Sequence, residues 1–355
     1  MLGKIALALA STLLTLLVLE AAARRELLPL PDSFVSDAWW EERWHRERRG
    51  LNPREFVELD PELGFVPAAG LSDYEYQGSR VSTNSDHMRG RREYPVERTG
   101  ASRVVVVGDS FTFGQCANDD ETYPAVMEAT LPNAEVLNLG VMGYGQDQAL
   151  LRLRRDGFRY RPDVVVFGFH KSNMERNLLA FRDYGKPRFR MTDSGLALEN
   201  VPVPMPADYD QLWPPRLWNF ARIYRDSLDA GSQEQRAYIR ELSRAIVHQM
   251  AADAEAFGAP LVVVHLPREV ALGRDESYGW AFMGEICADA DSKGFRCVTP
   301  LERFREIAST PEAVEHHFAC HYSPELYRAV GEVVSEVLLR EFPEIFPAAP
   351  SHRDS

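Results

Sequence analysis

A serine, a histidine and a glycine-rich turn in this sequence have the residue types and positions that nucleophilic chemistry requires. Ser110 follows a run of four β-branched residues at 104–107, typical of a buried central strand, with Gly108 and Asp109 at the turn. Ligands bind beyond the carboxyl ends of strands in open α/β sheets, so Ser110 is a candidate nucleophile. The alternative is that Ser110 only caps the helix that follows.

A nucleophilic serine needs a base that takes its proton and donors that stabilise a developing oxyanion. His321 lies just before the last helical segment, which begins at the sheet edge where the strands end, so we expect it to meet Ser110. Gly143 follows the second strand, and a glycine there lets a substrate oxygen approach a backbone N–H closely. Ordinary turn formation is the alternative for Gly143.

Other polar residues follow the predicted strands and are candidates to contact a substrate: Asp109, His170, His265 and Arg268. Three more histidines and cysteines gather around His321, namely His316, His317 and Cys320. They could hold zinc, but no second group of ligands stands at a usual spacing. The sequence has no dinucleotide-binding fingerprint, no P-loop and no GxSxG motif, so we expect neither a metal ion nor a cofactor.

These residues must be positioned by an alternation of strands and helices. Strands are predicted at residues 104–107, 134–137, 163–167, 260–265 and 295–298. Helices are predicted at residues 122–131, 146–158, 234–257, 278–293 and 324–341. Such alternation implies crossover connections and a parallel sheet, so we expect an α/β domain over residues 101–345. A hairpin formed by 189–192 and 196–199 is predicted within an insertion at about 178–232.

The N-terminus carries an apolar stretch that indicates a membrane segment. Residues 5–19 are apolar apart from one serine and two threonines, and basic residues flank them. Residues 4–23 nearly reach the about 20 residues that a membrane-spanning helix needs, so we expect residues 1–23 to be an uncleaved anchor. A signal peptide cleaved near Ala23 is the alternative. Either way the domain is expected outside the cytoplasm, membrane-anchored or secreted, where disulfides are permitted.

Residues 24–100 are expected to form a juxtamembrane helix and an irregular lead-in rich in Pro, Gly, Asp and Ser. Trp39, Trp40 and Trp44 are expected to pack this helix onto the domain, with lipid contact as the alternative. The 355 residues carry a net charge of -13, which argues against a nucleic-acid partner.

Four cysteines offer two pairings, Cys116 with Cys320 and Cys287 with Cys297. Cys116 lies close to Ser110 in the chain and Cys320 adjoins His321, so a disulfide there would brace both loops. Free, buried cysteines are the alternative.

Taken together, these residues resemble a known family. Gly108-Asp-Ser-Phe-Thr-Phe-Gly114 resembles the first block of the SGNH, or GDSL-type, hydrolases. Gly143 is similar to the glycine of their second block, and His321 to the histidine of their last block. The resemblance covers about residues 103–340. It is strongest to the membrane-anchored bacterial members, through Asn84, Arg176-Asn177 and Lys186-Pro-Arg-Phe189.

The resemblance implies a flavodoxin-like three-layer α/β/α sandwich with a mainly parallel five-stranded sheet. It also implies acyl-ester chemistry, in which Ser110 attacks a carbonyl and His321 acts as general base and then acid. The N–H groups of Ser110 and Gly143 would bind the oxyanion.

Two positions depart from the family pattern. The third block's Asn-Asp pair falls on Ser172-Asn173, so either the Ser172 hydroxyl or the Asn173 amide would replace the usual donor. The aspartate that normally precedes the histidine is missing, because Phe318 and Ala319 stand there. We expect a backbone carbonyl to orient His321 instead, with Glu315 or a neighbouring histidine as alternatives.

The sequence therefore predicts an extracytoplasmic, membrane-anchored serine esterase that acts on an acyl ester, with a surface glycan as the suggested substrate. An acyltransferase that uses the same serine is one alternative. A catalytically inactive module that binds a glycan or a protein is another.

Overall fold

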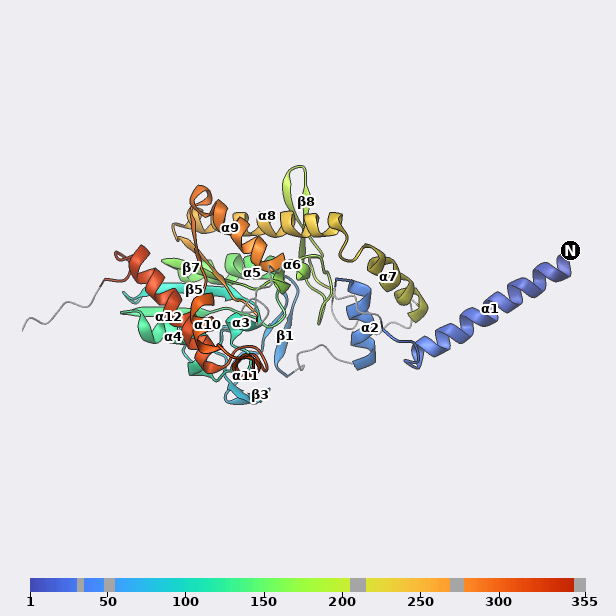
Figure 1. Ribbon diagram of the computed structural model, residues 1–355, viewed down its shortest axis with the longest axis horizontal. Helices are drawn as coiled ribbons and strands as arrows, with labels where there is room; N and C mark the ends of the chain where they lie inside the picture. The colour runs from blue at the N-terminus through green and yellow to red at the C-terminus, as the bar shows by residue number, and fades with distance from the viewer. Residues whose placement is uncertain (31–34, 48–54, 205–214, 269–277, 348–355) are drawn as a thin grey trace, which may run out of the picture.

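The computed structural model describes residues 1–30, 35–47, 55–204, 215–268 and 278–347 (Figure 1). At its centre lies a five-stranded parallel sheet with the strand order β11-β10-β7-β5-β6. Its strands are β5 (Ser102–Gly108), β6 (Ala134–Asn138), β7 (Val164–Phe169), β10 (Leu261–His265) and β11 (Phe295–Val298). In chain order the strands run 2-1-3-4-5, which is the flavodoxin-like doubly wound arrangement. The predicted three-layer fold is confirmed.

The valines of β5 explain why helices cover both faces of this sheet. Val104 and Val106 face one layer, Val105 and Val107 face the other, and none of the four side chains is exposed. Each such burial contributes about 1.5–3 kcal/mol. The first layer contains α4 (Tyr123–Thr130), α10 (Leu301–Ile307) and α12 (Pro324–Glu341). The second contains α5 (Gln146–Arg152), α8 (Gln233–Phe257) and α9 (Tyr278–Lys293).

Hydroxyl side chains fix the starts of three long helices. Thr122, Ser232 and Ser323 each accept a hydrogen bond from a backbone N–H in the first turn of α4, α8 and α12, respectively. Such caps are worth about 1 kcal/mol each. α12 begins at Pro324, three residues after His321, where the sequence pattern predicts its start.

The helix predicted at residues 146–158 is wrong in its extent. α5 ends at Arg152, and a π-helical turn (Leu153–Gly157) and a 3₁₀ turn (Phe158–Tyr160) follow. A Cβ atom on Gly157 would lie 3.0 Å from Val105 Cγ1, so this glycine lets the wider turn approach the sheet closely.

The lead-in packs against the loops that follow the strands. Two short antiparallel pairs, β1 (Val57–Asp60) with β2 (Gly64–Pro67) and β3 (Tyr74–Tyr76) with β4 (Ser79–Val81), precede the domain. Phe56 and Phe65 pack with Phe113, after β5, and Tyr144, after β6. The lead-in therefore supports the two turns that carry Ser110 and Gly143.

Helix α2 (Asp37–Glu47) is held onto the domain by its tryptophans, as predicted. Trp39 and Trp40 are buried and pack with Leu179, Phe181 and Ile223. Ile223 belongs to α7 (Arg216–Asp229), a helix in the insertion that the sequence pattern does not predict. The insertion also contains the predicted hairpin, β8 (Arg188–Thr192) with β9 (Gly195–Glu199), and its residues 205–214 lie outside the described residues.

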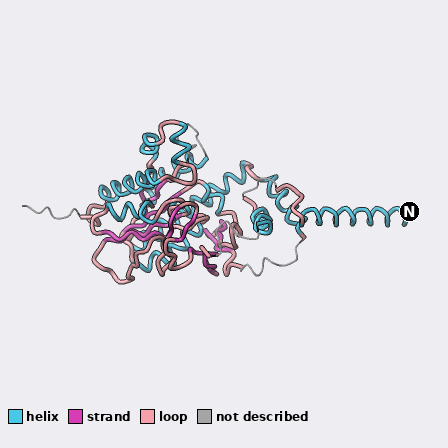
Figure 2. The backbone as a smooth tube through the Cα atoms, turned by 90° about the horizontal axis from the view of Figure 1, so that it is seen from below, coloured by secondary structure: helices cyan, strands magenta, loops and turns pink. Residues whose placement is uncertain are grey.

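Helix α1 (Leu2–Arg24) projects from the domain along the long axis of the molecule (Figures 1 and 2). Its most apolar 18-residue window has a mean hydropathy of 2.1, and none of that window is buried. By length and composition this helix can cross a membrane, which fits the predicted segment at residues 4–23.

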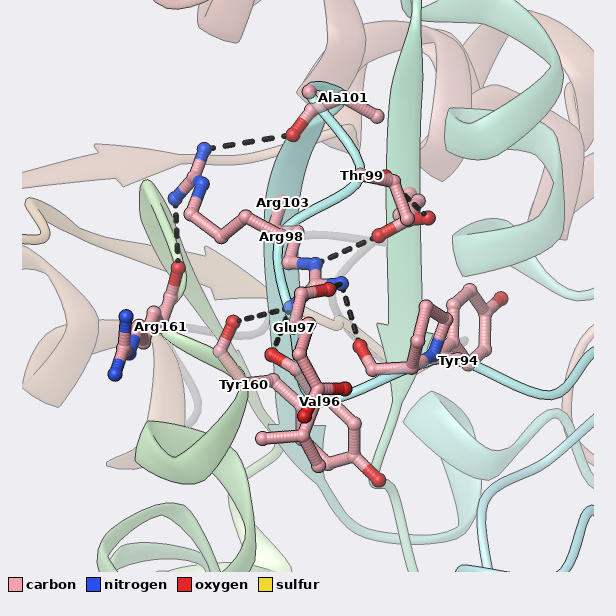
Figure 3. Close-up of polar contacts among 12 residues, drawn as sticks. Tyr94, Val96, Glu97, Arg98, Thr99, Ala101, Arg103, Tyr160 and Arg161 are labelled. Atoms are coloured by element: carbon pink, nitrogen blue, oxygen red, sulfur yellow. Dashed lines mark hydrogen bonds and ion pairs between the residues drawn. The ribbon is translucent and has the colours of Figure 1, made fainter.

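A buried arginine ties the lead-in to the N-terminal end of β5, at the opposite end of the strand from Ser110 (Figure 3). Arg103 is fully buried, and its Nε donates to Glu135 Oε2 at 2.7 Å. Its remaining N–H groups donate to the backbone carbonyls of Pro95, Val96, Glu97 and Tyr160. All five guanidinium donors are thus satisfied inside the protein.

Candidate active site

Ser110 lies at the first position of a short helix, α3 (Ser110–Phe113), immediately beyond the carboxyl end of β5. Asp109 is the N-cap residue, and its side chain accepts the Phe111 N–H at 3.0 Å. The hypothesis that Ser110 itself caps this helix is therefore wrong. With the cap supplied by its neighbour, the Ser110 hydroxyl is left for another partner.

That partner is His321, whose Nε2 lies 2.8 Å from Ser110 Oγ. His321 stands between α11 (Pro311–His317) and α12, in a loop that a Cys116–Cys320 disulfide joins to the turn after α3. The ring of Phe111 packs against the imidazole with 4.5 Å between ring centroids. The predicted meeting of the two residues across the sheet edge is present in the structure.

The imidazole of His321 is held in its neutral form. Burial lowers the pKa of His321 to about 4, because desolvation disfavours the charged ring. The Asp109 carboxylate opposes this shift, and the cations of Arg176 and Arg268 add to it. A neutral imidazole at pH 7 can accept a proton from the serine that it touches.

Nδ1 of His321, the ring nitrogen opposite the one that contacts Ser110, has Cys320 Sγ at 3.9 Å. The Cys320 backbone is the last of the causes that act on the pKa of His321, and it raises that pKa. Glu315 is exposed, and no contact joins it to His321 among the described residues. His317 is engaged elsewhere, with its Nδ1 2.7 Å from Ser323 Oγ.

The turn after β6 presents Gly143 beside the serine loop. Its φ of +89° lies in the left-handed region, and a Cβ there would collide with the guanidinium of Arg182. In the described part of the chain, the N–H groups of Ser110 and Gly143 have no hydrogen-bond acceptor. Both are thus available to a substrate oxygen.

Asn173, in the segment after β7, connects the turn after β5 to the turn after β6. Its amide nitrogen donates to Asp109 Oδ2 at 3.0 Å and to the Tyr144 carbonyl at 3.2 Å, while its oxygen accepts the His170 N–H at 2.7 Å. Both amide donors are used within the protein. Neighbouring Ser172 is half-buried and donates its N–H to His170 Nδ1 at 3.3 Å.

Asp109 is fully buried and serves as the acceptor of this network. Besides the Phe111 N–H and the Asn173 amide, it accepts a 2.9 Å hydrogen bond from Arg176 Nη1. The same nitrogen donates to the Tyr144 carbonyl at 3.0 Å. The geometry makes Asp109 a positioning residue that fixes the serine turn.

His170 carries a buried donor with no partner. Because Nδ1 accepts the Ser172 N–H, the proton of the neutral ring belongs on Nε2. That Nε2 is buried and has no hydrogen-bond partner over the described residues. Burial lowers the pKa of His170 well below its ordinary value. Its ring packs on Phe111 at 4.5 Å, on the same side chain that contacts His321.

His265 ends β10 and lies further along the sheet edge. Burial lowers its pKa to about 4, and its Nδ1 lies 3.4 Å from Thr299 Oγ1. It lines a mainly apolar hollow of about 190 Å³ together with the Cys287–Cys297 disulfide. Arg268 is exposed, and its charge affects the pKa of both His170 and His321.

Two arginines contribute to this site although the sequence did not predict a role for either. Arg176 bridges the serine and glycine turns, and Arg182 packs on Gly143 and pairs with Asp183 at 2.7 Å. Burial lowers the pKa of Arg182 to about 10. Arg176 belongs to the Arg176-Asn177 pair that resembles the anchored SGNH members, and this resemblance was the sequence signal that could have indicated its role.

The cysteines near His321 form a disulfide. Sγ atoms of Cys116 and Cys320 and the His321 ring lie close enough to share a metal ion, but the disulfide removes the thiolates that would bind it. The second pair is Cys287 with Cys297, and the structure contains no free cysteine.

No protein-family model and no curated protein matches the chain. Among solved structures, it is similar to a G-D-S-L family protein from Desulfitobacterium hafniense, with 18% identity, a TM-score of 0.42, and coverage of 67% of this chain and 99% of that one. A GDSL-like lipase from Bacteroides thetaiotaomicron shares 12% identity, with a TM-score of 0.39 and coverage of 70% and 93%. The acetylxylan esterase Axe2 from Geobacillus stearothermophilus, as a catalytic mutant, shares 13% identity, with a TM-score of 0.39 and coverage of 68% and 94%.

Proposed function

We propose that the chain is an extracytoplasmic, membrane-anchored serine ester hydrolase of the SGNH type. The observation that carries this proposal is the 2.8 Å contact between Ser110 Oγ and Nε2 of His321, a half-buried imidazole whose pKa desolvation lowers to about 4. A hydroxyl in contact with a neutral imidazole is the pairing that acyl transfer through a serine requires.

In the proposed reaction, Ser110 Oγ attacks the ester carbonyl carbon while His321 Nε2 takes its proton. The oxyanion accepts hydrogen bonds from the N–H groups of Ser110 and Gly143, and each such donor is worth about 10²- to 10³-fold in rate. Collapse breaks the ester C–O bond, and the leaving alkoxide takes the proton from His321. Water then attacks the acyl-serine and gives a proton to His321. Collapse breaks the bond between the acyl carbon and Ser110 Oγ, which takes that proton back from His321 as the acid leaves.

The buried Nε2–H of His170 would supply a third donor to the substrate. Asn173, one of the two candidates for the asparagine of the family pattern, is engaged, since both its amide donors bind protein acceptors. Of the other polar residues that follow the strands, His265 and Arg268 would line the outer part of the same edge.

The anchor and the disulfides support a location outside the cytoplasm. α1 can cross a membrane by length and composition, and both cysteine pairs form disulfides, which persist in oxidising compartments. A surface glycan that bears acyl esters is the substrate that this location suggests.

A fluorophosphonate probe tests the proposal directly, because it labels serines whose hydroxyl is activated. The full chain in detergent is expected to be labelled, and labelling should disappear in Ser110→Ala and fall strongly in His321→Gln. Ser194→Ala, at the exposed tip of the β8–β9 hairpin, is the matched serine control, and His316→Gln, also exposed, is the histidine control.

Absence of labelling at every pH, in protein whose fold is intact by circular dichroism, would favour the inactive binding module. Labelling with transfer of the acyl group to an added alcohol in preference to water would identify the acyltransferase.

A further inference from the structure

Helix α7 exposes an apolar face to the outside of the molecule. Trp218, Tyr224 and Leu228 are 58%, 67% and 68% exposed, and Ala221, also exposed, lies between them at helical spacing. Arg225, which pairs with Asp226 at 2.8 Å, lies within this stripe, and the exposed Asp229 lies at its edge. A helix on the surface of a water-soluble domain turns such a face inward, so this orientation needs an explanation.

The inward face of α7 shows that the orientation is specific. Arg216 forms two 2.7 Å hydrogen bonds with the buried Glu42 of α2. Arg222 pairs with Glu41 at 2.8 Å, and Asp226 accepts a 2.6 Å hydrogen bond from Ser36. Arg216, Arg222, Asp226 and the buried Ile223 therefore face the protein, while Trp218, Tyr224 and Leu228 are left outside.

Helix α7 is also fixed to the end of the anchor helix. Both carboxylate oxygens of Glu20, in α1, accept backbone N–H groups at the start of α7, from Arg216 at 3.1 Å and from Leu217 at 2.9 Å. Arg24 pairs with the same carboxylate at 2.7 Å. Figure 1 shows α7 beside the inner end of α1, with the rest of α1 projecting away.

The length of α1 sets the depth of this junction. Its 23 residues span about 35 Å, slightly more than the about 30 Å of a bilayer core. When α1 crosses a membrane, its Glu20–Arg24 end lies at the membrane surface. Glu20 binds the backbone N–H groups of Arg216 and Leu217, and Trp218 is the next residue. We therefore place Trp218 at the membrane surface, where tryptophan and tyrosine are enriched.

We propose that the outer face of α7 lies in the headgroup region of the membrane that α1 enters, with lipid as its occupant. Arg225 would extend from the apolar stripe to the phosphates. Lipid is favoured over a second copy of the chain because the stripe continues directly from an apolar helix that is itself unburied. The proposal rests on the membrane anchoring proposed above, and it is independent of the esterase chemistry.

Tryptophan fluorescence of the full chain in phosphatidylcholine and phosphatidylglycerol vesicles tests the proposal. Phospholipids brominated near the headgroup are expected to quench the wild type, and this quenching should fall in Trp218→Phe. It should stay unchanged in Trp39→Phe, the matched control, because Trp39 is only 7% exposed and packs inside the protein.

Equal quenching in wild type and Trp218→Phe would overturn the proposal. So would free access of aqueous acrylamide to Trp218 in vesicles, or protection of Trp218 from both quenchers, which would indicate a second copy of the chain. Flotation of the vesicles reports anchoring separately, and failure to float would overturn the anchor and the α7 contact together. Loss of fluorophosphonate labelling would bear only on the esterase.

Discussion

Ser110 Oγ and His321 Nε2 lie 2.8 Å apart, although 211 residues separate them in the chain. The contact forms because β5 ends and α12 begins at the same edge of one parallel sheet. Phe111 contacts the rings of both His170 and His321, so one aromatic side chain positions the base and a buried donor together.

The pH dependence of the esterase should reflect the lowered pKa of His321. Burial lowers its pKa to about 4, and the base is active only when neutral. We therefore expect kcat/KM for a chromogenic acetate ester to stay level from neutral pH down to about pH 5 and to fall as the pH drops through about 4. A midpoint near the ordinary histidine value of about 6.5 would contradict this expectation.

Arg176→Met should move that acid limb to higher pH. Burial is the largest cause that lowers the pKa of His321, and the nearby Arg176 cation lowers it further. Removing this cation therefore makes the imidazole easier to protonate. Arg190→Met is the matched control, because Arg190 is exposed on β8 and pairs with Glu199. An unchanged limb, or one moved to lower pH, would show that Arg176 does not act on His321 electrostatically.

Glu315→Gln should leave turnover of the same ester close to that of the wild type. Glu315 is exposed and has no contact with His321 among the described residues, so we expect its carboxylate to have no part in orienting the base. Loss of an orienting carboxylate from a serine-protease triad costs on the order of 10⁴-fold. A loss as large as that in Ser110→Ala would make Glu315 the orienting group and overturn the backbone hypothesis.

His170→Phe should lower kcat by about 10²- to 10³-fold with little change in KM, if the Nε2–H stabilises the oxyanion. Phenylalanine keeps the ring contact with Phe111 but removes the donor. His170→Gln, which restores an N–H donor, should recover part of the rate. Full activity in His170→Phe would show that the substrate does not use this donor.

The fold could be predicted from local patterns because the buried strands are short valine-rich runs with alternating helices between them. Crossover connections imply that the strands are parallel. The closeness of Ser110 and His321 could be predicted because β5 ends and α12 begins at the same edge of such a sheet. Helix α7 was not predicted, because its apolar stripe, with Trp218 and Leu228, faces outward. Its sequence pattern is therefore not that of a helix packed on the core.

The polar network of the site was less accessible to the sequence. Which donors remain free depends on contacts between loops that are distant in the chain, such as Asn173 with Asp109 and Arg176 with Tyr144. Residue type predicts that a histidine or an asparagine can donate, but only the assembled loops show that Asn173 is engaged and that His170 Nε2 is not.

Arg103→Met should destabilise the domain by about 3–5 kcal/mol, because it removes the buried cation that contacts Glu135 at 2.7 Å and leaves only the more distant, half-exposed Arg92 at 3.5 Å. Urea unfolding measures this loss, and activity at low temperature should persist since Arg103 lies at the far end of β5 from Ser110. Arg98→Met is the matched control visible in Figure 3. Its partly exposed pair with Asp163 is worth less than about 1 kcal/mol. Equal losses would show that burial of Arg103 carries no special weight.

Removal of the Cys116–Cys320 disulfide should lower both activity and stability. The bond joins the turn after Ser110 to the residue before His321, so a Cys116→Ser/Cys320→Ser double variant lets the base drift from the nucleophile. We expect kcat to fall on the order of tenfold or more, since displacements of about 1 Å can cost about 10²-fold. The control is Cys287→Ser/Cys297→Ser, which opens a bond away from this pair.

The two disulfides should also differ in their effect on stability. Chain entropy predicts that the free energy of unfolding falls by about 5 kcal/mol without the first bond, which spans 204 residues, and by about 3 kcal/mol without the second, which spans 10. Unfolding in urea and ester turnover distinguish the two effects, because a purely structural role would lower stability in the first variant while leaving kcat unchanged.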